Sequence, residues 1–261
     1  MTRVGVFGAA GRMGSTVCEA VEGDPALELV AAVDPLHAGI DLRRVANVDS
    51  TLLVEKAPQA LVDAGADVVV DFTVAEAARQ NLAFCAEQGL HAVAGTTGLS
   101  DGDFDAIRGD FTKSSCLIAA NFSIGAVLMM RFAELAAPWF ETAEIIELHH
   151  DGKIDAPSGT AMRTAERMAA SSSDWSDDPT TDHVVEGARG GSGPGGIPIH
   201  SVRLHGLFAH QEVLLGTSGQ SLTIRHDTYD RTCYMPGVLL AVKRVHERPG
   251  LTLGLEPLLD L

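Results

Sequence analysis

The sequence predicts an α/β protein with two domains, one built on a parallel sheet and one of α+β type with a mixed or antiparallel sheet. Three observations predict this. Short apolar runs alternate with segments of helical periodicity in the first half of the chain, as expected for β-α-β units with strands buried on both faces. A glycine-rich turn directly follows the first apolar run. In the second half, a loop-like stretch precedes three strand-like runs.

The composition limits the kinds of partner that this protein binds. Its 261 residues are 46% hydrophobic, which is enough for one large core or two modest cores. The formal net charge is -16, from 19 Lys and Arg against 35 Asp and Glu. This acidity opposes binding to nucleic acid or to an anionic membrane, so neither is expected as a partner. A site for a small anion must therefore supply its own cations or backbone N–H groups.

The cysteines and the hydropathy indicate a cytoplasmic protein without a metal site. Cys18, Cys85, Cys116 and Cys233 are widely spaced, with no C-x-x-C pair and no zinc-like cluster. We expect reduced thiols that lie mostly in the core. The chain starts without a hydrophobic signal segment, and no apolar run is long enough to span a bilayer.

The first strand and turn predict a dinucleotide site. An apolar strand over Thr2–Phe7 runs into the pattern G-x-x-G-x-x-G between Gly8 and Gly14, and a helix follows. Glycines permit a tight turn and close approach to a pyrophosphate, which then sits at the helix N-terminus. The pattern alone is also compatible with an ordinary loop. The candidate cofactor residues of this Rossmann-like turn are Gly8, Ala9, Ala10, Gly11, Arg12 and Met13.

Asp34 is the candidate ribose ligand. It ends a second strand over Leu29–Val33 and lies twenty residues after Gly14, where a carboxylate accepts hydrogen bonds from the adenosine ribose. The alternative is that Asp34 caps a turn before Pro35. A carboxylate also repels a 2′-phosphate, and the following residues, Pro35–His37, include no arginine. We therefore expect NADH to be used at least as well as NADPH.

The next β-α-β units predict two further loops at the same sheet edge. Strands are expected at Val68–Phe72, His91–Ala94 and Leu117–Ala120, with a helix at Val74–Gln88. The strand His91–Ala94 runs into Gly95-Thr-Thr-Gly98, and the strand Leu117–Ala120 runs into Asn121-Phe122-Ser123. Ligands of open α/β sheets bind beyond the carboxyl ends of the strands, although Gly-Thr-Thr-Gly alone is typical of an ordinary turn.

The remaining elements follow from periodicity and turn residues. We expect a long helix from Ser123 to Pro138, a loop from Ser171 to Gly196 rich in Ser, Asp, Gly and Pro, and a helix starting at Pro236. The strands expected in this half are Ala143–Leu148, Ile199–His205, Ala209–Gly216 and Gln220–Asp227, with an apolar strand or coil over Leu251–Leu255.

The stretch from Glu147 to Thr160 carries the most unusual chemistry. His149 and His150 end a strand, and Lys153 follows after an Asp-Gly pair that favours a turn. The turn would bring the ammonium back toward the imidazoles. Each of these residues alone is more often structural than functional. Together they supply a proton donor beside a fixed positive charge.

An anion site is expected directly after these residues. Pro157 ends the extended segment, Ser158 is a good N-cap, and Gly159 and Thr160 open a helix. Free N–H groups at such a helix start attract a carboxylate. The whole stretch therefore suits a small anionic substrate with an unsaturated or carbonyl-like centre.

This stretch resembles the substrate motif of the dihydrodipicolinate reductases, Glu-x-His-His-x-x-Lys-x-Asp-Ala-Pro-Ser-Gly-Thr. Every fixed position matches between Glu147 and Thr160. The resemblance also covers the glycine-rich start, the Gly95–Gly98 loop and Asn121-Phe122, and so extends over essentially the whole chain. It implies reduction of 4-hydroxy-tetrahydrodipicolinate to tetrahydrodipicolinate, in diaminopimelate and lysine biosynthesis, with NADH, NADPH or both.

The resemblance also implies roles for individual residues. His149 would donate a proton with the assistance of Lys153, and the substrate, a small dicarboxylate, would be held by His150, Lys153, Ser158, Gly159 and Thr160. The loops Gly95–Gly98 and Asn121–Ser123 would line the nicotinamide, with Thr97 and the backbone around Ala120 and Phe122 holding the ring and its carboxamide. The cofactor-binding residues at this edge of the sheet would be Phe72, Gly95, Thr96, Thr97, Ala119, Ala120, Asn121 and Phe122.

The resemblance further implies the domain boundaries and the assembly. Residues 1–122 and 232–261 would form a discontinuous dinucleotide-binding domain, and residues 123–231 a substrate-binding and oligomerisation domain. The sheet of the second domain would pack against its copies in a homotetramer.

Two other functions share part of this pattern. A dehydrogenase of an amino-acid semialdehyde would need a catalytic cysteine or a different acid-base set, and no cysteine here follows a fitting loop. A non-catalytic dinucleotide sensor would keep Gly8–Gly14 but would have no reason to retain His149 and Lys153 in one intact motif.

Overall fold

The computed structural model describes residues 1–261, and they divide into two compact units. The first unit comprises Met1–Ile124 and Tyr234–Leu261, and is therefore discontinuous, while the second comprises Gly125–Cys233. Each unit contains one sheet. No helix is both long enough and apolar enough to cross a membrane.

The first unit is built on a seven-stranded sheet in which every neighbouring pair is parallel. Its strand order is β12-β6-β5-β4-β1-β2-β3. The strands are β1 Thr2–Phe7, β2 Leu27–Val33, β3 Val54–Glu55, β4 Val68–Asp71, β5 His91–Ala94, β6 Ser115–Ile118 and β12 Gly250–Leu253. The expected C-terminal strand therefore exists, and it pairs with β6 in this sheet.

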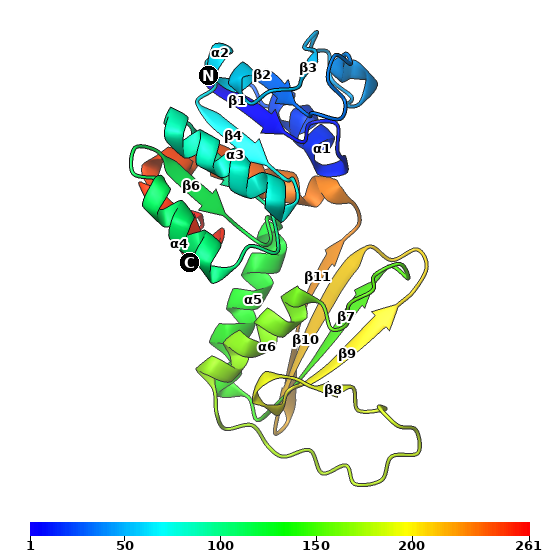
Figure 1. Cartoon of the computed structure of the whole chain (residues 1–261). Helices are drawn as coiled ribbons and strands as arrows, with labels where there is room; N and C mark the ends of the chain where they lie inside the picture. Colours follow the sequence, from blue (N-terminus) through cyan, green and yellow to red (C-terminus); the bar gives the residue numbers. More distant parts are fainter. The chain divides into compact units, whose positions relative to one another are not determined.

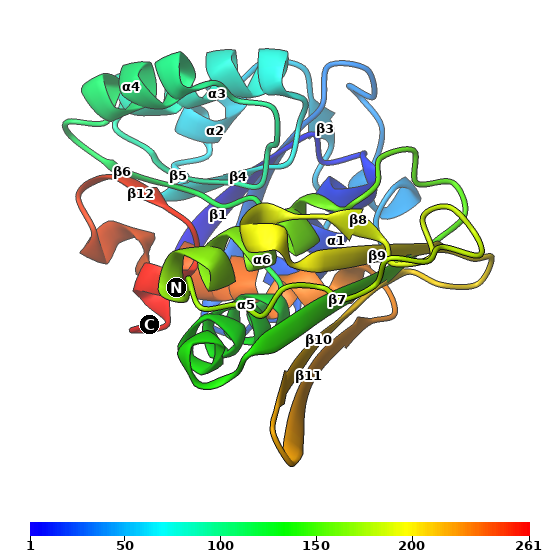
Figure 2. The same cartoon turned by 90° about the horizontal axis from the view of Figure 1, so that it is seen from below.

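Helices cover both faces of this sheet. They are α1 Arg12–Glu22, α2 Gln59–Asp63, α3 Ala75–Gln88, α4 Asp101–Asp110 and α7 Met235–Arg244. Figure 2 shows α2, α3 and α4 together on one face, and α1 packs with α7. The sequence patterns did not predict β3, α2 or α4. The signal for α4 was its capping box, in which the Ser100 side chain accepts from Asp103 N–H and Asp103 accepts from Ser100 N–H.

The order of the strands creates a switch point beside β1. The chain winds outward in one direction through β1, β2 and β3, and in the other through β4, β5 and β6. At the carboxyl end of β1, Phe7 leads into the glycine-rich turn, and at the end of β4, Asp71 leads into Phe72. The doubly wound fold places ligand sites at this edge.

The second unit is built on a five-stranded mixed sheet in the order β11-β10-β7-β9-β8. Its strands are β7 Thr142–His149, β8 Gly191–Ser192, β9 Pro198–Arg203, β10 Ala209–Thr217 and β11 Gln220–Thr228. β7 and β9 are parallel, and the other neighbours are antiparallel. The hairpin expected between β10 and β11 is present.

Two helices, α5 Ile124–Ala136 and α6 Gly159–Ser171, lie along one side of this sheet (Figure 1). On β7, burial alternates strictly, with Ala143, Ile145 and Glu147 buried. This alternation shows that one face is covered and the other is open. A hydrogen bond from Gln211 Nε2 to Thr164 Oγ1, 2.8 Å long, joins β10 to α6 inside the covered face.

The long loop expected over residues 171–196 is shorter in the structure. It begins after α6 and ends at β8, which pairs with β9, and a 3₁₀ turn follows at Pro194–Gly196. The ion pairs of Arg189 with Glu144 (2.7 Å) and Asp178 (3.0 Å) hold the loop on the sheet. The other 3₁₀ turns of the chain are Leu42–Arg44, Ala137–Trp139, Arg231–Tyr234, Val245–Glu247 and Glu256–Leu258.

Candidate active site

The glycine-rich turn between β1 and α1 is shaped by close backbone contacts. Gly8 has a φ of 62°, which favours glycine, and Gly11 N–H donates to Gly8 O at 2.9 Å. A Cβ on Gly14 would lie 2.0 Å from Gly8 O. Gly11, the N-cap of α1, offers no side-chain cap, so N–H groups of the first helical turn remain available to an anion.

The loops that follow β1, β4, β5 and β6 meet around Phe72. A Cβ on Gly95 would lie 2.0 Å from the Phe72 ring, so glycine is required there. The rings of Phe72 and Phe122 are 5.6 Å apart between centroids. Thr96 Oγ1 donates to Thr73 O at 3.0 Å, and Gly8 lies against the Thr73 methyl group. The structure therefore brings together loops that the sequence placed at four separate strand ends.

Asp71 supports these loops and was missed in the sequence. Its side chain is buried and accepts hydrogen bonds from Thr73 N (2.7 Å), Thr73 Oγ1 (2.6 Å) and Asn81 Nδ2 (2.8 Å). The available signal was a carboxylate at the end of a fully apolar strand, since a buried carboxylate needs such partners.

Asp34 accepts hydrogen bonds from the glycine-rich turn and from the turn that follows β2. Its carboxylate accepts from Ala10 N at 3.3 Å and Leu36 N at 3.1 Å, and His37 Nδ1 lies 3.1 Å away. The turn-capping interpretation of Asp34 is therefore correct. It does not exclude ribose binding, because Asp34 stands beside the turn that would hold the pyrophosphate.

The predicted cofactor residues differ in exposure. Gly11, Arg12, Thr97 and Ala120 are exposed, and Gly8, Ala10, Met13, Phe72, Gly95 and Asn121 are half-buried. Ala9, Thr96, Ala119 and Phe122 are buried, so they can serve a ligand through their backbone or by packing beneath it.

In the second unit, the motif begins at the end of β7. His149 is the last residue of this strand, and its Nδ1 lies 2.5 Å from Glu147 Oε2. His150 is exposed. The expected turn forms, with Lys153 N–H donating to His150 O at 3.2 Å. The Lys153 ammonium binds the Asp155 carboxylate at 2.8 and 2.7 Å, an ion pair that the motif spacing did not predict.

Glu147 is the buried centre of this motif. Arg203 binds it with both terminal nitrogens, at 2.9 Å each, and Ser158 N–H donates to it at 3.1 Å. Burial raises the pKa of Glu147, but hydrogen bonds from His149, Arg203 and Ser201 outweigh it and lower the pKa to about 2. Glu147 is thus ionised. Sequence reasoning gave it no role and missed Arg203, which is distant in sequence and pairs with His149 across β7 and β9.

The start of α6 has the predicted N-cap, at the place where an anion site is expected. The Ser158 hydroxyl accepts from Ala161 N–H at 3.2 Å, as an N-cap does. The N–H groups of Gly159 and Thr160 are left for a ligand, and no atom lies within 4 Å of a Cβ built on Gly159. The peptide bond between Ala156 and Pro157, just before this N-cap, is cis.

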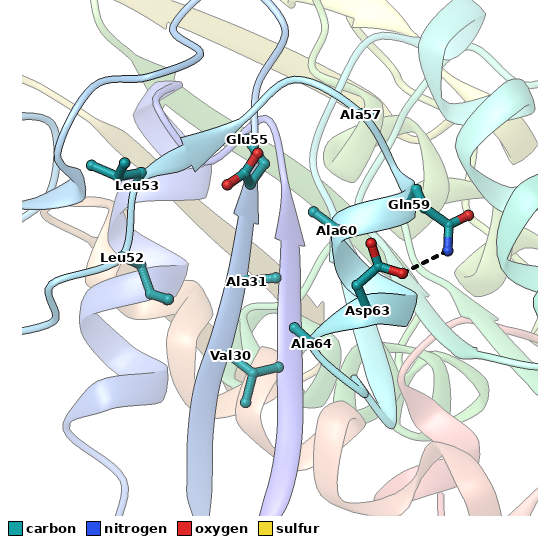
Figure 3. A pocket seen from close by; sticks show the side chains of 10 residues that line it. All are labelled: Val30, Ala31, Leu52, Leu53, Glu55, Ala57, Gln59, Ala60, Asp63 and Ala64. Carbon is teal, nitrogen blue, oxygen red and sulfur yellow. Dashed lines mark hydrogen bonds between the residues drawn. The ribbon is translucent and has the colours of Figure 1, made fainter.

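Two cavities lie elsewhere in the molecule. One, of ≈ 430 Å³, lies in the first unit between β2, the segment before β3 and α2, and Figure 3 shows the Gln59 amide bound to Asp63 at its rim. Another, of ≈ 620 Å³, lies in the second unit beside Trp175 and Arg189. Neither is lined by a predicted site residue. No group of three or more His, Cys, Asp and Glu side chains could hold a metal ion.

The two units therefore offer complementary chemistry. The first has an uncapped helix start, glycines that allow close approach and a carboxylate, as a dinucleotide requires. The second has an imidazole held by a buried carboxylate, an ammonium and free N–H groups, which together suit proton donation to a small anion.

Comparisons with known proteins identify the family. The family profile "Dihydrodipicolinate reductase, N-terminus" matches residues 2–122, and "Dihydrodipicolinate reductase, C-terminus" matches residues 125–259. Proteins named 4-hydroxy-tetrahydrodipicolinate reductase are similar over nearly their whole length. One from Mycobacterium sp. (strain KMS) is 51% identical over 99% of both chains, and one from Corynebacterium urealyticum is 48% identical over 100% of both.

Solved structures agree with these matches. The dipicolinate-bound dihydrodipicolinate reductase from Paenisporosarcina sp. TG-14 is 41% identical, with a TM-score of 0.86 over 98% of this chain and 99% of that one. An amine dehydrogenase from Mycobacterium smegmatis is 14% identical, with a TM-score of 0.64 over 96% of this chain and 94% of that one, and it shares the fold alone. With both halves of the sequence matched by one family and the motif from Glu147 to Thr160 intact, this chain belongs to the dihydrodipicolinate reductase family.

Proposed function

We propose that this protein reduces 4-hydroxy-tetrahydrodipicolinate to tetrahydrodipicolinate with a nicotinamide cofactor, in the diaminopimelate and lysine pathway, in the cytoplasm. The observation that carries the proposal is the imidazole of His149, held by Glu147 beside the cradle at the start of α6. Family membership and relatives that share the printed name at about half identity support the same reaction.

Different residues would bind the cofactor, bind the substrate and donate the proton. When bound, the dihydronicotinamide supplies the hydride, and the glycines and the uncapped start of α1 fit its dinucleotide. Gly159 and Thr160 would hold one substrate carboxylate through their N–H groups. Lys153 and His150 would face the other charges of the substrate, and Lys153 would leave Asp155 to do so. His149 would donate a proton as negative charge develops on the substrate ring.

The state of the cysteines argues against the rival semialdehyde dehydrogenase. That chemistry needs a reactive thiolate. Burial raises the pKa of Cys18 to about 12 and raises the pKa of Cys85 and Cys116 as well. The half-buried Cys233 has its pKa raised by the same cause. A coupled assay tests the proposal: dihydrodipicolinate synthase generates the substrate, and oxidation of the cofactor is followed by its absorbance at 340 nm.

The cradle at the start of α6 should bind pyridine-2,6-dicarboxylate in competition with the substrate. A relative of known structure carries dipicolinate, and the planar dicarboxylate matches N–H groups beside an ammonium. Calorimetry of the wild type should show binding that is weakened at least tenfold in the double variant Lys153→Ala, Thr160→Val. Lys113→Ala, on an exposed loop of the first unit, is the control. Undiminished binding in the double variant would show that neither the Lys153 ammonium nor the Thr160 hydroxyl contacts the dicarboxylate.

NADH should be used at least as well as NADPH. A 2′-phosphate near Asp34 would face a carboxylate, and the nearest arginine in sequence, Arg43, already binds Asp41 through Nε at 2.9 Å. The side chain that contacts the Asp34 carboxylate is His37, through Nδ1 at 3.1 Å. The double variant Asp34→Ala, Pro35→Arg should shift the ratio of kcat/KM values toward NADPH. A wild-type preference for NADPH of tenfold or more, ~1.4 kcal/mol, would contradict this expectation.

The open face of the second sheet is proposed as the surface that assembles a homotetramer. Ile146, Leu148, Val202 and Leu214 share this face by register and are half-buried in the single chain. Apolar strands of this kind are usually covered. Light scattering should show a tetramer that dissociates in the variant Leu148→Arg and persists in the control Val184→Arg, which changes a fully exposed loop residue. A monomeric wild type would contradict the assembly.

A further inference from the structure

Glu147 is a fully buried carboxylate to which the proposed reaction assigns no step. It lies two residues before His149 on the covered side of β7. A buried charge is strongly unfavourable unless partners compensate it. The hydrogen-bond partners of Glu147 therefore indicate the role of this carboxylate.

The two carboxylate oxygens of Glu147 serve different parts of the motif. Oε2 meets His149 Nδ1 at 2.5 Å and Arg203 Nη1 at 2.9 Å. Oε1 accepts from Arg203 Nη2 at 2.9 Å and from Ser158 N–H at 3.1 Å. An ionised carboxylate can only accept hydrogen bonds. The proton shared with His149 therefore belongs to Nδ1, and Nε2 is the nitrogen left to exchange a proton.

Arg203 completes the arrangement in two ways. Its Nη2 also donates to the carbonyl of Asp155 at 2.6 Å, which ties down the segment between Lys153 and the cradle. Its charge offsets that of Glu147, and a guanidinium keeps this charge at any working pH. The carboxylate consequently stays ionised beside the imidazole, and the proton stays on His149 rather than moving to Glu147.

We infer that Glu147 and Arg203 act as positioning residues, which hold His149 in the Nδ1–H form, aim Nε2 at the substrate and lock the α6 cradle to the same centre. The inference rests on the proposed function, in which His149 is the proton donor. In each turnover the Nε2 proton passes to the substrate, the Nδ1 proton stays on His149 in its hydrogen bond to Glu147, and a proton taken up from the solvent restores Nε2–H.

The variant Glu147→Gln tests this inference. Glutamine has nearly the same shape but removes the charge, and its amide can donate to Nδ1 and so favour the wrong tautomer. We expect kcat to fall by ~10²–10⁴-fold, as when an orienting carboxylate or a general acid is lost. The KM for substrate should change much less. The alkaline limb of the pH profile of kcat should move to lower pH, because protonated His149 loses its neighbouring negative charge.

A matched control lies on the same strand. Glu144 is bound by an arginine and a histidine too, Arg189 at 2.7 Å and His200 at 2.7 Å, but these lie away from the motif. Glu144→Gln should leave kcat and its alkaline limb close to those of the wild type. In contrast, Arg203→Lys, which keeps the charge but loses the two-pronged contact, should lower kcat by less than Glu147→Gln and leave the alkaline limb in place.

Three results would overturn the inference. The first is wild-type turnover in Glu147→Gln, and the second is reduced turnover with an unshifted alkaline limb, which would indicate a structural role alone. The third is a neutral His149 ring protonated at Nε2, observed by ¹⁵N NMR of the wild type. The His149 signals are identified by their loss in His149→Gln. This measurement decides the question even if Glu147→Gln does not fold. An inactive wild type in the coupled assay would instead contradict the proposed function. The NMR result on the protonation of His149 would still stand.

Discussion

Replacing His149 by glutamine should lower kcat by ~10²–10⁴-fold and change the KM for substrate far less. The reason is that a proton donor acts in the transition state, whereas the proposed function assigns substrate affinity to the N–H groups at the start of α6 and to Lys153. Glutamine can still accept or donate a hydrogen bond, but it cannot give up a proton at neutral pH. Steady-state kinetics in the coupled assay, at saturating cofactor, measures both constants.

The neighbouring histidine provides the contrast for this experiment. His150 is exposed and is proposed to contact the substrate carboxylate. His150→Gln should therefore raise KM more than it lowers kcat. Near-normal turnover in His149→Gln would remove this residue from its role, and a large loss of kcat in His150→Gln would move the role to the adjacent side chain.

Replacing Gly14 by alanine should disable the glycine-rich turn. The added Cβ would lie 2.0 Å from Gly8 O, 2.7 Å from Gly8 C and 2.9 Å from Ala9 Cα. All three are main-chain atoms, so the turn and the start of α1 must move apart. We expect the KM for NADH to rise at least tenfold, and the free energy of unfolding to fall by about 1–3 kcal/mol, the usual cost of overpacking.

A second glycine on the same helix is the control for Gly14→Ala. Gly23 is the C-cap of α1 with a φ of −73°, and its nearest neighbour to an added Cβ is the Glu19 carbonyl oxygen at 3.4 Å. Gly23→Ala should leave the KM for NADH unchanged, since it does not touch the turn. Initial rates in the coupled assay at varied NADH, together with thermal unfolding, measure both effects. An unaltered KM in Gly14→Ala would show that the cofactor binds away from this turn.

The local elements were predictable because local chemistry determines them. Apolar runs followed by glycine predicted β1 and β5, and a near-continuous apolar run predicted β4. The residues from Ser158 to Thr160 predicted the start of α6. Short or weakly apolar elements were missed. β3 has two residues and α2 has five, and such lengths carry no detectable period. Parallel pairing of β7 with β9 could not be inferred either, because pairing joins strands that are remote in sequence.

The sequence by itself determined the local arrangement of groups: a glycine-rich turn before a helix, and a motif that sets His149 and Lys153 before the N-cap of a second helix. The tertiary structure decided which partners these groups contact. Phe72 packs against Gly95 and Phe122. Arg203 reaches Glu147 from β9, and Asp155 holds Lys153. The physical reason is that burial and long-range pairing determine which charges are compensated and which proton is free to move. Both depend on contacts between residues that are distant in sequence.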